Sequence, residues 1–443
     1  MRLTRFLSST AALLALGSVA PAGAQPPPPA AAPVDPNDLL GNIVVVAGAG
    51  RPLPKIAVLP SLASDMEDVT LRSVVRRDLD LSGEFELLPE SAAPEGLYLP
   101  DTPVDVKAWS GKGVEAVVKV SGKKLDATRA ELRGVVYFVK HGDAPVLDER
   151  FAVPVSRLRE ESHRLADRLI GALTGQNGGF ASHMTFAAGS GGLRRVFTID
   201  ADGHDVKAIS PADKSAIAPA YGKKGELYYA AAAPNGLYEI YTGTGTHVPI
   251  PYQGSVYGIA FSRDHAQVAV SLGVGSTVKV FTGPDFASLK PASDIGMALR
   301  PTFTPSGKLA FAGEGKVGQR VYVDGQPITP DGLWASSPAF CNHPDGVRTV
   351  FAVGVGKDTD LVSTGEKGGP LVRLTQNQGR NGYPACSPDG RLVAFFSTRT
   401  SGEGPGLYIM RVDGGRPKRV SPLVGDSLRW DALPPGSAEE IKN

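Results

Sequence analysis

The sequence lacks an excess of charge of either sign. Its 443 residues include 46 Lys and Arg against 45 Asp and Glu, which gives a formal net charge of +1. Nucleic-acid-binding proteins usually carry a basic excess or a basic stripe, so the charge balance argues against that class. Long apolar runs are also missing after the N-terminus, where no stretch could cross a bilayer. We therefore expect no nucleic-acid partner and no direct membrane insertion of the mature chain.

Motifs of nucleotide-binding and serine-hydrolase sites are missing as well. Gly-Ala-Gly at 48–50 leads into Arg-Pro-Leu-Pro rather than into a helix, which disfavours a dinucleotide site. No G-x-S-x-G nucleophile elbow occurs. The seven histidines are scattered without ligand spacing, and His163, inside a predicted helix, is interpreted as a surface or capping residue. We predict no catalytic residue, no cofactor and no bound metal.

Cysteine is scarce, with Cys341 and Cys386 as the two residues. An exported protein can form a disulfide between such residues. In the alignment of the repeats described below, each copy has an anchor residue in its inner strand. Cys386 is the anchor of its copy, whereas Cys341 lies one residue after the anchor of its own copy, Phe340. Neighbouring residues of a strand point to opposite faces, so this offset turns the two thiols apart unless the Asn-His-Pro insertion at 342–344 re-aims one of them. We expect two buried free thiols.

The N-terminus has the pattern of an export signal. Arg2 and Arg5 precede an apolar core at 6–20, and Ala-Gly-Ala at 22–24 supplies small residues for a signal peptidase. We expect a signal peptide over 1–24, with cleavage after Ala24. The next segment, 25–41, is rich in proline and is expected to form an extended arm without helix or sheet.

Residues 42–176 alternate between strand and helix patterns. A buried strand at 55–60 precedes an amphipathic helix at 66–83, whose apolar residues recur near the helical period. Further strand patterns lie at 85–89, 116–122, 129–143 and 145–154. A helix at 156–175, with Ser156 as its expected N-cap, ends the region. Strands interrupted by helices predict an α/β N-terminal domain.

Residues 179–432 contain a repeat. Each copy has an inner strand ending near an anchor residue, a turn rich in Pro, Asp and Gly, and a second strand rich in aromatic and β-branched residues. The clearest copy, 384–398, holds the turn Ser-Pro-Asp-Gly. The anchors are Tyr221, Phe261, Phe303, Phe340, Cys386 and Trp430. Their steps of 40, 42, 37, 46 and 44 residues are typical of a four-stranded propeller blade.

The two ends of the repeat region complete one another. Strand patterns at 183–188, 193–200 and 206–210 lack an inner strand, whereas 427–432 is an inner strand without a blade. Joining them closes a ring of six blades and leaves no long exposed sheet edge. The sequence thus predicts an α/β domain followed by an all-β six-bladed β-propeller closed by its C-terminal strand, with 433–443 as a C-terminal tail.

A propeller alone leaves other functions open. A peptidase-related chain would need a nucleophile elbow, and a lactonase-like enzyme would need His or carboxylates converging on the channel. Asp294 and Asp426 are expected near a channel mouth and are the carboxylates that could touch Ca²⁺. A propeller enzyme and a metal-dependent binding protein therefore remain as alternatives to a scaffold.

The chain resembles the TolB family, the periplasmic components of the bacterial Tol–Pal envelope system. The resemblance rests on the Ile-Ala-Val-Leu-Pro strand at 56–60, the helix and junction at 158–180, and six blades with Ser-Pro-Asp-Gly-type turns. It implies a monomeric, non-enzymatic periplasmic scaffold that supports envelope integrity and constriction at division. It further implies that the propeller mouth binds Pal, a peptidoglycan-associated OmpA-like lipoprotein, and that the N-terminal region contacts TolA in the inner membrane.

Loops that precede the inner strands are expected to converge on one channel mouth. Aromatic and arginine side chains dominate the binding energy of many protein interfaces. Four such residues lie in these loops and are the predicted partner-binding residues: Tyr257, Arg300, Trp334 and Arg380.

Overall fold

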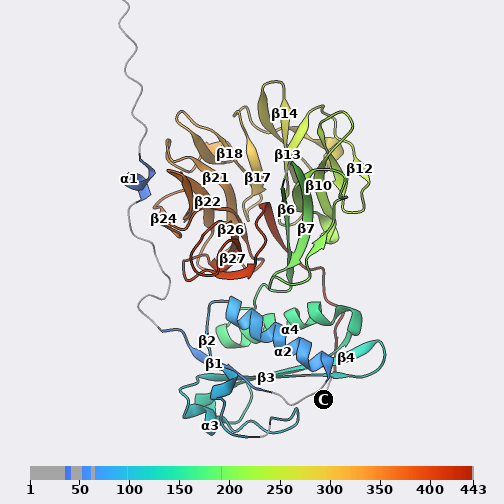
Figure 1. The fold of residues 1–443 in the computed structure, drawn as a ribbon, viewed down its shortest axis with the longest axis vertical. Helices are drawn as coiled ribbons and strands as arrows, with labels where there is room; N and C mark the ends of the chain where they lie inside the picture. Colours follow the sequence, from blue (N-terminus) through green and yellow to red (C-terminus); the bar gives the residue numbers. More distant parts are fainter. Residues whose placement is uncertain (1–34, 41–51, 61–64, 97, 191, 442–443) are drawn as a thin grey trace, which may run out of the picture. The chain divides into compact units, whose positions relative to one another are not determined.

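The computed structural model describes residues 35–40, 52–60, 65–96, 98–190 and 192–441. Two architectures follow one another along the chain, a sheet covered by helices and then six four-stranded sheets (Figure 1). The predicted fold class, an α/β domain followed by a six-bladed β-propeller, is confirmed. The predicted signal peptide at 1–24 and residues 25–34 of the predicted arm lie outside the described residues.

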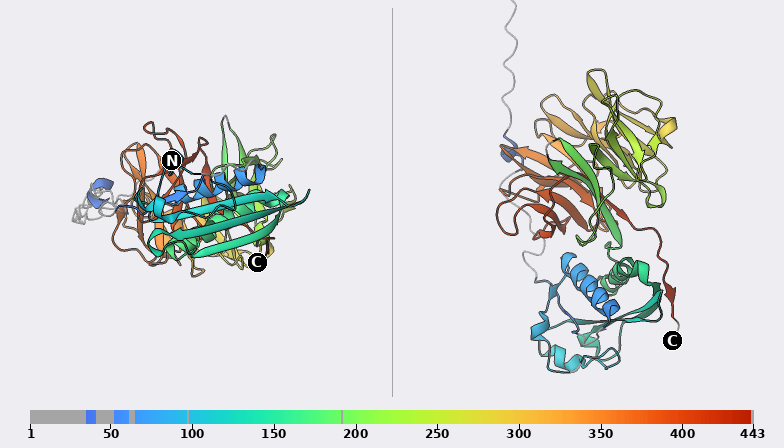
Figure 2. Two further views of the ribbon diagram at one scale, coloured as in Figure 1. Left: turned by 90° about the horizontal axis from the view of Figure 1, so that it is seen from below. Right: turned by 45° about the vertical axis from the view of Figure 1, so that its right-hand side comes forward.

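The first architecture is a six-stranded sheet with the order β2-β1-β3-β4-β5-β30. Strand β1 pairs in parallel with β2 and β3, and the remaining pairs are antiparallel. The strands are β1 (Lys55–Val58), β2 (Glu86–Leu87), β3 (Ala116–Lys124), β4 (Arg129–Phe138), β5 (Leu147–Pro154) and β30 (Glu439–Glu440). The long strands of this sheet and the helix α2 above them are visible in the left view of Figure 2.

Helices α2 (Met66–Leu81) and α4 (Leu158–Thr174) pack against each other and cover one face of this sheet (Figure 1). Most of their predicted apolar residues are buried, because the helical period gathers them on one side, but Val69 of α2 is 48% exposed. The short helix α3 (Val106–Ser110) places Trp109 in a separate apolar cluster with Ala57 and Val117 of the sheet. No described helix combines the length and the apolar character needed to cross a membrane.

The predicted cap of α4 is wrong. Ser156 lies inside a 3₁₀ turn (Val155–Arg157) that precedes the helix, and Arg157 takes the cap position without a side-chain cap bond. At the C-terminal end, Gly175 adopts a φ of 87° that a residue with a Cβ rarely takes, and the helix ends there.

The expectation that the whole arm lacks helix is also wrong. Residues Pro36–Leu40 form the short helix α1, whose first turn tolerates proline because the missing N–H has no partner there anyway. The amide of Asn37 donates to Asp35 Oδ1 at 2.9 Å. Leu40 is 7% exposed and packs with Leu333 and Phe351 of the propeller. The contact of Leu40 with the propeller stabilises helix α1, and the composition of the arm alone does not predict this contact.

The second architecture consists of six blades, named here from blade one to blade six, each with its inner strand first. Blade one is β29 (Asp426–Ala432), β6 (Ser182–Ser190), β7 (Leu193–Asp200) and β8 (Lys207–Ala208). Blade two is β9 (Ala216–Tyr221), β10 (Leu227–Ala232), β11 (Tyr238–Thr242) and β12 (His247–Val248). Blade three is β13 (Ser255–Phe261), β14 (Val268–Val274), β15 (Thr277–Gly283) and β16 (Lys290–Pro291).

The remaining blades repeat this antiparallel order. Blade four is β17 (Leu299–Phe303), β18 (Leu309–Glu314), β19 (Gln319–Val323) and β20 (Gln326–Pro327). Blade five is β21 (Ala335–Cys341), β22 (Arg348–Val355), β23 (Asp358–Gly365) and β24 (Val372–Arg373). Blade six is β25 (Asn381–Cys386), β26 (Leu392–Ser397), β27 (Gly406–Arg411) and β28 (Lys418–Ser421).

The ring closes as the sequence predicts. Strand β29 pairs with β6 in antiparallel register, with Trp430 opposite Met184. Trp430 Nε1 also donates to Ser182 Oγ at 2.7 Å. The chain then continues to the α/β sheet, where β30 pairs with β5 and Glu439 lies opposite Ala152. The predicted C-terminal tail therefore contains an edge strand, which two acidic residues without an apolar pattern do not indicate.

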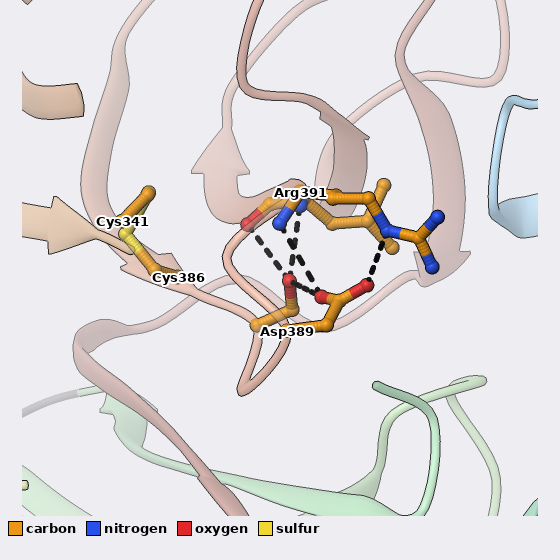
Figure 3. Close-up of a disulfide and its surroundings, with 6 residues drawn as sticks. Cys341, Cys386, Asp389 and Arg391 are labelled. Atoms are coloured by element: carbon orange, nitrogen blue, oxygen red, sulfur yellow. Dashed lines mark hydrogen bonds and ion pairs between the residues drawn. A yellow bond between two sulfur atoms is a disulfide. The ribbon is translucent and has the colours of Figure 1, made fainter. Parts of the chain in front are cut away.

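The two cysteines form a disulfide, so the expectation of free thiols is wrong (Figure 3). Their Cα atoms are 5.1 Å apart. Each blade packs between two others, so a side chain on one face of β21 points toward the next blade. Cys341 and Cys386 belong to neighbouring blades, five and six, and meet because one points forward and the other points back. The one-residue offset thus brings the thiols together. The alternation of side chains along a strand, which was expected to turn the thiols apart, instead points them toward each other because they belong to neighbouring blades.

The Ser-Pro-Asp-Gly turn of blade six is held by its own side chains (Figure 3). The amide of Leu392 donates to Ser387 Oγ at 2.9 Å, and Arg391 Nε donates to Asp389 Oδ2 at 2.8 Å. Gly390 has a φ of 77°, as the predicted turn requires. Arg391 Nη2 also donates to the carbonyl of Asn177, 3.0 Å away. The turn therefore also fastens blade six to the segment that follows α4.

Candidate partner-binding site at the propeller mouth

One end of the propeller is formed by the loops before the inner strands and by the turns between second and third strands. In blade three, Ser255 at the start of β13 pairs with Gly273, close to the turn that joins β14 and β15. The loop before β17 contacts the same turn, since the amide of Met297 donates to Thr277 Oγ1 at 3.3 Å. We call this end the mouth.

Exposed apolar side chains gather at the mouth. Trp334 is 57% exposed, although tryptophan usually buries most of its surface. Among the described propeller residues, Val206 is the one strongly exposed large apolar side chain that lies elsewhere. The exposed apolar residues of the mouth are Leu193, Tyr257, Val274, Met297, Val317, Trp334 and Val424. Clustered apolar exposure is typical of a surface that binds another macromolecule.

Trp334 has a strained backbone conformation and lies against the neighbouring blade. Its φ is 52°, in the left-handed region that costs a non-glycine residue about 1 kcal/mol or more. Its ring lies so close to the β18–β19 turn that a Cβ on Gly318 would sit 2.8 Å from the indole. Its carbonyl accepts from the amide of Gly354 at 3.4 Å. Glycine at 318 therefore leaves room for an indole that solvent reaches.

The other predicted partner-binding residues divide into two groups. Tyr257, 42% exposed, lies on the mouth beside Gly273 of its own blade. Arg380 is exposed and its Nε donates to the carbonyl of Lys357 at 3.3 Å. Arg300 instead lies partly buried in the channel, with its guanidinium 4.8 Å from the Tyr383 ring centroid. The structure thus brings three of the four to the mouth and one into the channel.

Sequence reasoning missed the apolar residues in the hairpin turns. Leu193, Val274 and Val317 each lie in or beside a Gly-rich turn between second and third strands, and all three are exposed. An apolar residue at the tip of a glycine-rich hairpin has no core to enter. That mismatch between residue type and position is the signal that could have found them.

The inner strands narrow the channel below the mouth. The pairing of each of the six inner strands contains a register shift, for example between Leu299 and Thr302 in β17. At this point five blades place a residue with positive φ, namely Ala218, Arg300, Ser337, Tyr383 and Ser427. Such bulges turn side chains out of the regular pleat, and here they line the channel.

The opposite end of the channel opens into a chamber of about 470 Å³. Its wall includes all six anchor residues, among them Phe261 and Phe303, together with polar side chains that include Arg263, His265 and Asp431. His265 Nε2 lies 3.7 Å from Asp431 Oδ2, and burial raises the pKa of that carboxyl. The size falls within the usual range for a small-ligand pocket.

The interpretation of His163 as a surface or capping residue is wrong. It is 2% exposed, and its Nδ1 lies 2.6 Å from Asp78 Oδ2 of α2. Burial raises the pKa of Asp78 to about 6. Burial would lower the pKa of His163, but the adjacent Asp78 carboxylate raises it to about 9. The two residues therefore form a buried ion pair at neutral pH, which their separation of 85 residues conceals in the sequence.

Asp78, His163 and Asp202 place ligand-type atoms within 4.8 Å of one another. Arg159 already pairs with Asp202, and its Nε lies 2.8 Å from Asp200 Oδ2. A guanidinium at this position supplies the positive charge that a metal would bring. The two carboxylates that the sequence suggested for Ca²⁺, Asp294 and Asp426, have different partners. Asp426 pairs with Arg194, whereas Asp294 is fully exposed and lies 3.8 Å from Lys279 Nζ.

Known proteins match both architectures. Residues 41–142 match the TolB amino-terminal domain family model. The Tol-Pal system protein TolB of Albidiferax ferrireducens is 27% identical over 215 residues, covering 48% of this chain and 47% of that protein. TolB of Bordetella avium is 27% identical over 210 residues, with 47% and 46% covered. These alignments thus span about half the length of each relative.

A solved structure extends the likeness to the fold of the propeller. The crystal structure of TolB from Acinetobacter baumannii superimposes with a TM-score of 0.70 at 19% identity. The match covers 85% of this chain and 96% of that one. Residues 41–142 are thus similar to the TolB amino-terminal domain, and the chain shares the fold of the Acinetobacter baumannii TolB structure over most of its length.

Proposed function

We propose that the chain is a periplasmic, non-enzymatic scaffold of a Tol–Pal system. Its mouth binds a Pal-like, peptidoglycan-associated OmpA-like lipoprotein, and its N-terminal region binds a TolA-like inner-membrane protein. Through these two contacts it supports envelope integrity and constriction at division. The relatives named above are Tol-Pal system proteins, which supports placing this chain in such a system.

The observation that carries the proposal is the apolar exposure of the mouth. Seven exposed large apolar side chains share this end, with Trp334 and Tyr257 among them. Burying such surface is the main favourable contribution to protein association, and aromatic side chains supply most of it at hot spots. Arg380 beside them provides a charged donor of the type found at interface rims. A folded protein partner, rather than a small polar ligand, fits this combination.

The N-terminal contact is proposed on the resemblance and on chain order. Helix α1 lies on the propeller, where Arg373 Nη1 donates to Asn37 Oδ1 at 3.0 Å. Residues 25–34 precede it and lie outside the described residues. A partner that recognises proline-rich extended chain would bind them without unfolding any described element.

Capture from the organism's own envelope tests the proposal. Mature protein immobilised through its C-terminus is expected to retain a lipoprotein with an OmpA-like domain, identified by mass spectrometry. Protein with Trp334→Ser should retain less, whereas Val206→Ser, at the exposed valine outside the mouth, should retain the wild-type amount. Absence of any OmpA-like lipoprotein from the captured set, with the propeller folded by circular dichroism, would contradict the proposal.

A further inference from the structure

Two arginines cross the channel in opposite directions. Arg300 extends from blade four and donates to Ser427 Oγ of blade one. Arg429 extends from blade one, where its Nη2 donates to the carbonyls of Ile259 in blade three, at 3.1 Å, and Pro301 in blade four, at 2.9 Å. Blades one and four are opposite each other in a ring of six. Both arginines line the same small cavity of the channel.

Neither guanidinium forms an ion pair with a carboxylate of the described residues. The partners of Arg300 are a hydroxyl and the Tyr383 ring, and those of Arg429 are carbonyls. Asp426, the carboxylate next to Ser427, is paired with Arg194. Arg429 Nε is buried and has no hydrogen-bond partner. Burying charge without a counter-charge costs several kcal/mol, so the arrangement calls for an anion.

Electrostatics at Arg429 points the same way. Burial, followed by the repulsion from Arg300, lowers the pKa of Arg429 to about 10. A negative charge placed between the two guanidiniums would offset this repulsion.

The space between the arginines is small. Arg300, Arg429, Tyr383 and Ser427 line a cavity of about 20 Å³ together with Pro338. A cavity needs roughly 10–15 Å³ to hold one water molecule, so this one accepts a single water-sized particle. Phosphate, sulfate or the carboxyl group of a side chain is larger. A monatomic anion of the chloride class fits both the volume and the charge.

We propose that the propeller channel contains a halide-binding site between Arg300 and Arg429. The donors are the unpartnered Nε of Arg429 and the guanidinium N–H groups of Arg300 that face the cavity. Because Arg429 lies on the strand that closes the ring and Arg300 on the opposite blade, the anion ties the closing strand across the channel. Bound halide therefore stabilises the closed ring.

Thermal unfolding of the mature protein at constant ionic strength tests the site, with sodium chloride or bromide replacing sodium gluconate. An anion that binds only the folded state raises Tm with a logarithmic dependence on its concentration. We expect this rise for the wild type and for Arg263→Gln, which removes an exposed arginine outside the site. Arg300→Gln and Arg429→Gln should lose it.

Crystals soaked in bromide give a second measurement that does not depend on the folding of any variant. Wild-type crystals should show an anomalous difference peak between the two guanidiniums. A Tm equal in chloride and gluconate, together with no bromide peak at this position, would overturn the proposal. A halide-dependent Tm that persists in both glutamine variants would place the site elsewhere and would overturn it equally.

Discussion

At the scale of single residues, the buried pair Asp78–His163 decides how the domain interface responds to pH. His163 lies on α4, Asp78 on α2, and Arg159, Asp200 and Asp202 face them. The positive charge of His163 is thus surrounded by carboxylates that burial prevents water from screening. The pair stabilises the packing of α2 and α4 on blade one as long as the imidazole keeps its proton.

This arrangement predicts lower stability at alkaline pH. The pKa of His163 is about 9 in the folded protein and about 6.5 in an unfolded chain. A raised folded-state pKa gives stability that is complete below pH 6.5 and lost as the pH rises through about 9. The free energy of unfolding should fall by an amount on the order of 3 kcal/mol between pH 6.5 and 10.

Urea denaturation at a series of pH values measures the effect. His163→Gln should flatten the slope between pH 7 and 9, while His247→Gln, at an exposed histidine, should leave it unchanged. Burial raises the pKa of Asp78 to about 6 and that of Asp167 to about 7. These carboxyls therefore lose their protons at lower pH than His163 does, and their effect on stability falls mainly below the range of pH 7 to 9. An equal slope in wild type and His163→Gln would show that the imidazole is not the group that titrates.

At the scale of elements, the disulfide joins blades five and six near the ends of their inner strands. Its two cysteines are 45 residues apart, and a bridge across such a loop typically contributes about 2–4 kcal/mol. We expect Cys341→Ser/Cys386→Ser to unfold at correspondingly lower urea concentration. Reduction should lower the stability of the wild type to that of the double variant and leave the variant unchanged. One or two titratable thiols in denatured, unreduced wild type would contradict the bridge.

The Ser-Pro-Asp-Gly turn offers a matched pair of glycine substitutions. Gly390 and Gly402 both have positive φ, 77° and 67°. A Cβ on Gly390 would lie 2.2 Å from the carbonyl oxygen of Asn342, whereas a Cβ on Gly402 would meet nothing within 4 Å. Gly402→Ala should therefore cost only about 1 kcal/mol of conformational strain, and Gly390→Ala clearly more. Equal losses of stability in the two variants would show that blade five does not approach the turn this closely.

The elements that the sequence predicts depend on local patterns, whereas those that it fails to predict depend on contacts between residues far apart in the sequence. The helices 66–81 and 158–174 and the four strands of each blade follow from local period and turn chemistry. Helix α1 depends on Leu40 meeting the propeller, and β30 depends on the open edge of β5. The disulfide depends on two neighbouring blades facing each other. Such partners lie far away in sequence, so no local pattern records them.

The candidate site shows the same division. Loop position and residue type are enough to predict Tyr257, Trp334 and Arg380 at the mouth, because inner strands of a propeller begin at one end. The placement of Arg300 inside the channel depends on a bulge in β17, and the sequence 299–303 does not predict this bulge. Whether a side chain leaves the regular pleat is decided by the packing of six blades around one axis.

At the scale of the whole molecule, the two ends of the propeller differ in what covers them. The turn of blade six contacts the segment after α4 through Arg391, and the helices contact blades one and six through pairs such as Arg159–Asp200 and Lys418–Asp80. The mouth presents exposed apolar side chains instead. One end of the propeller is thus occupied by contacts within the chain, and the mouth is the end that a second protein can cover.

The most direct test of this account is the affinity of the mature protein for the purified OmpA-like domain of the organism's Pal-like lipoprotein, measured by isothermal titration calorimetry. Replacing a hot-spot aromatic residue typically costs about 2 kcal/mol or more, so Trp334→Ser should weaken binding by at least about thirtyfold. Val206→Ser, which removes an exposed apolar side chain away from the mouth, should bind like the wild type. Equal affinities of all three proteins, or no binding by the folded wild type, would contradict the assignment of the mouth as the partner site.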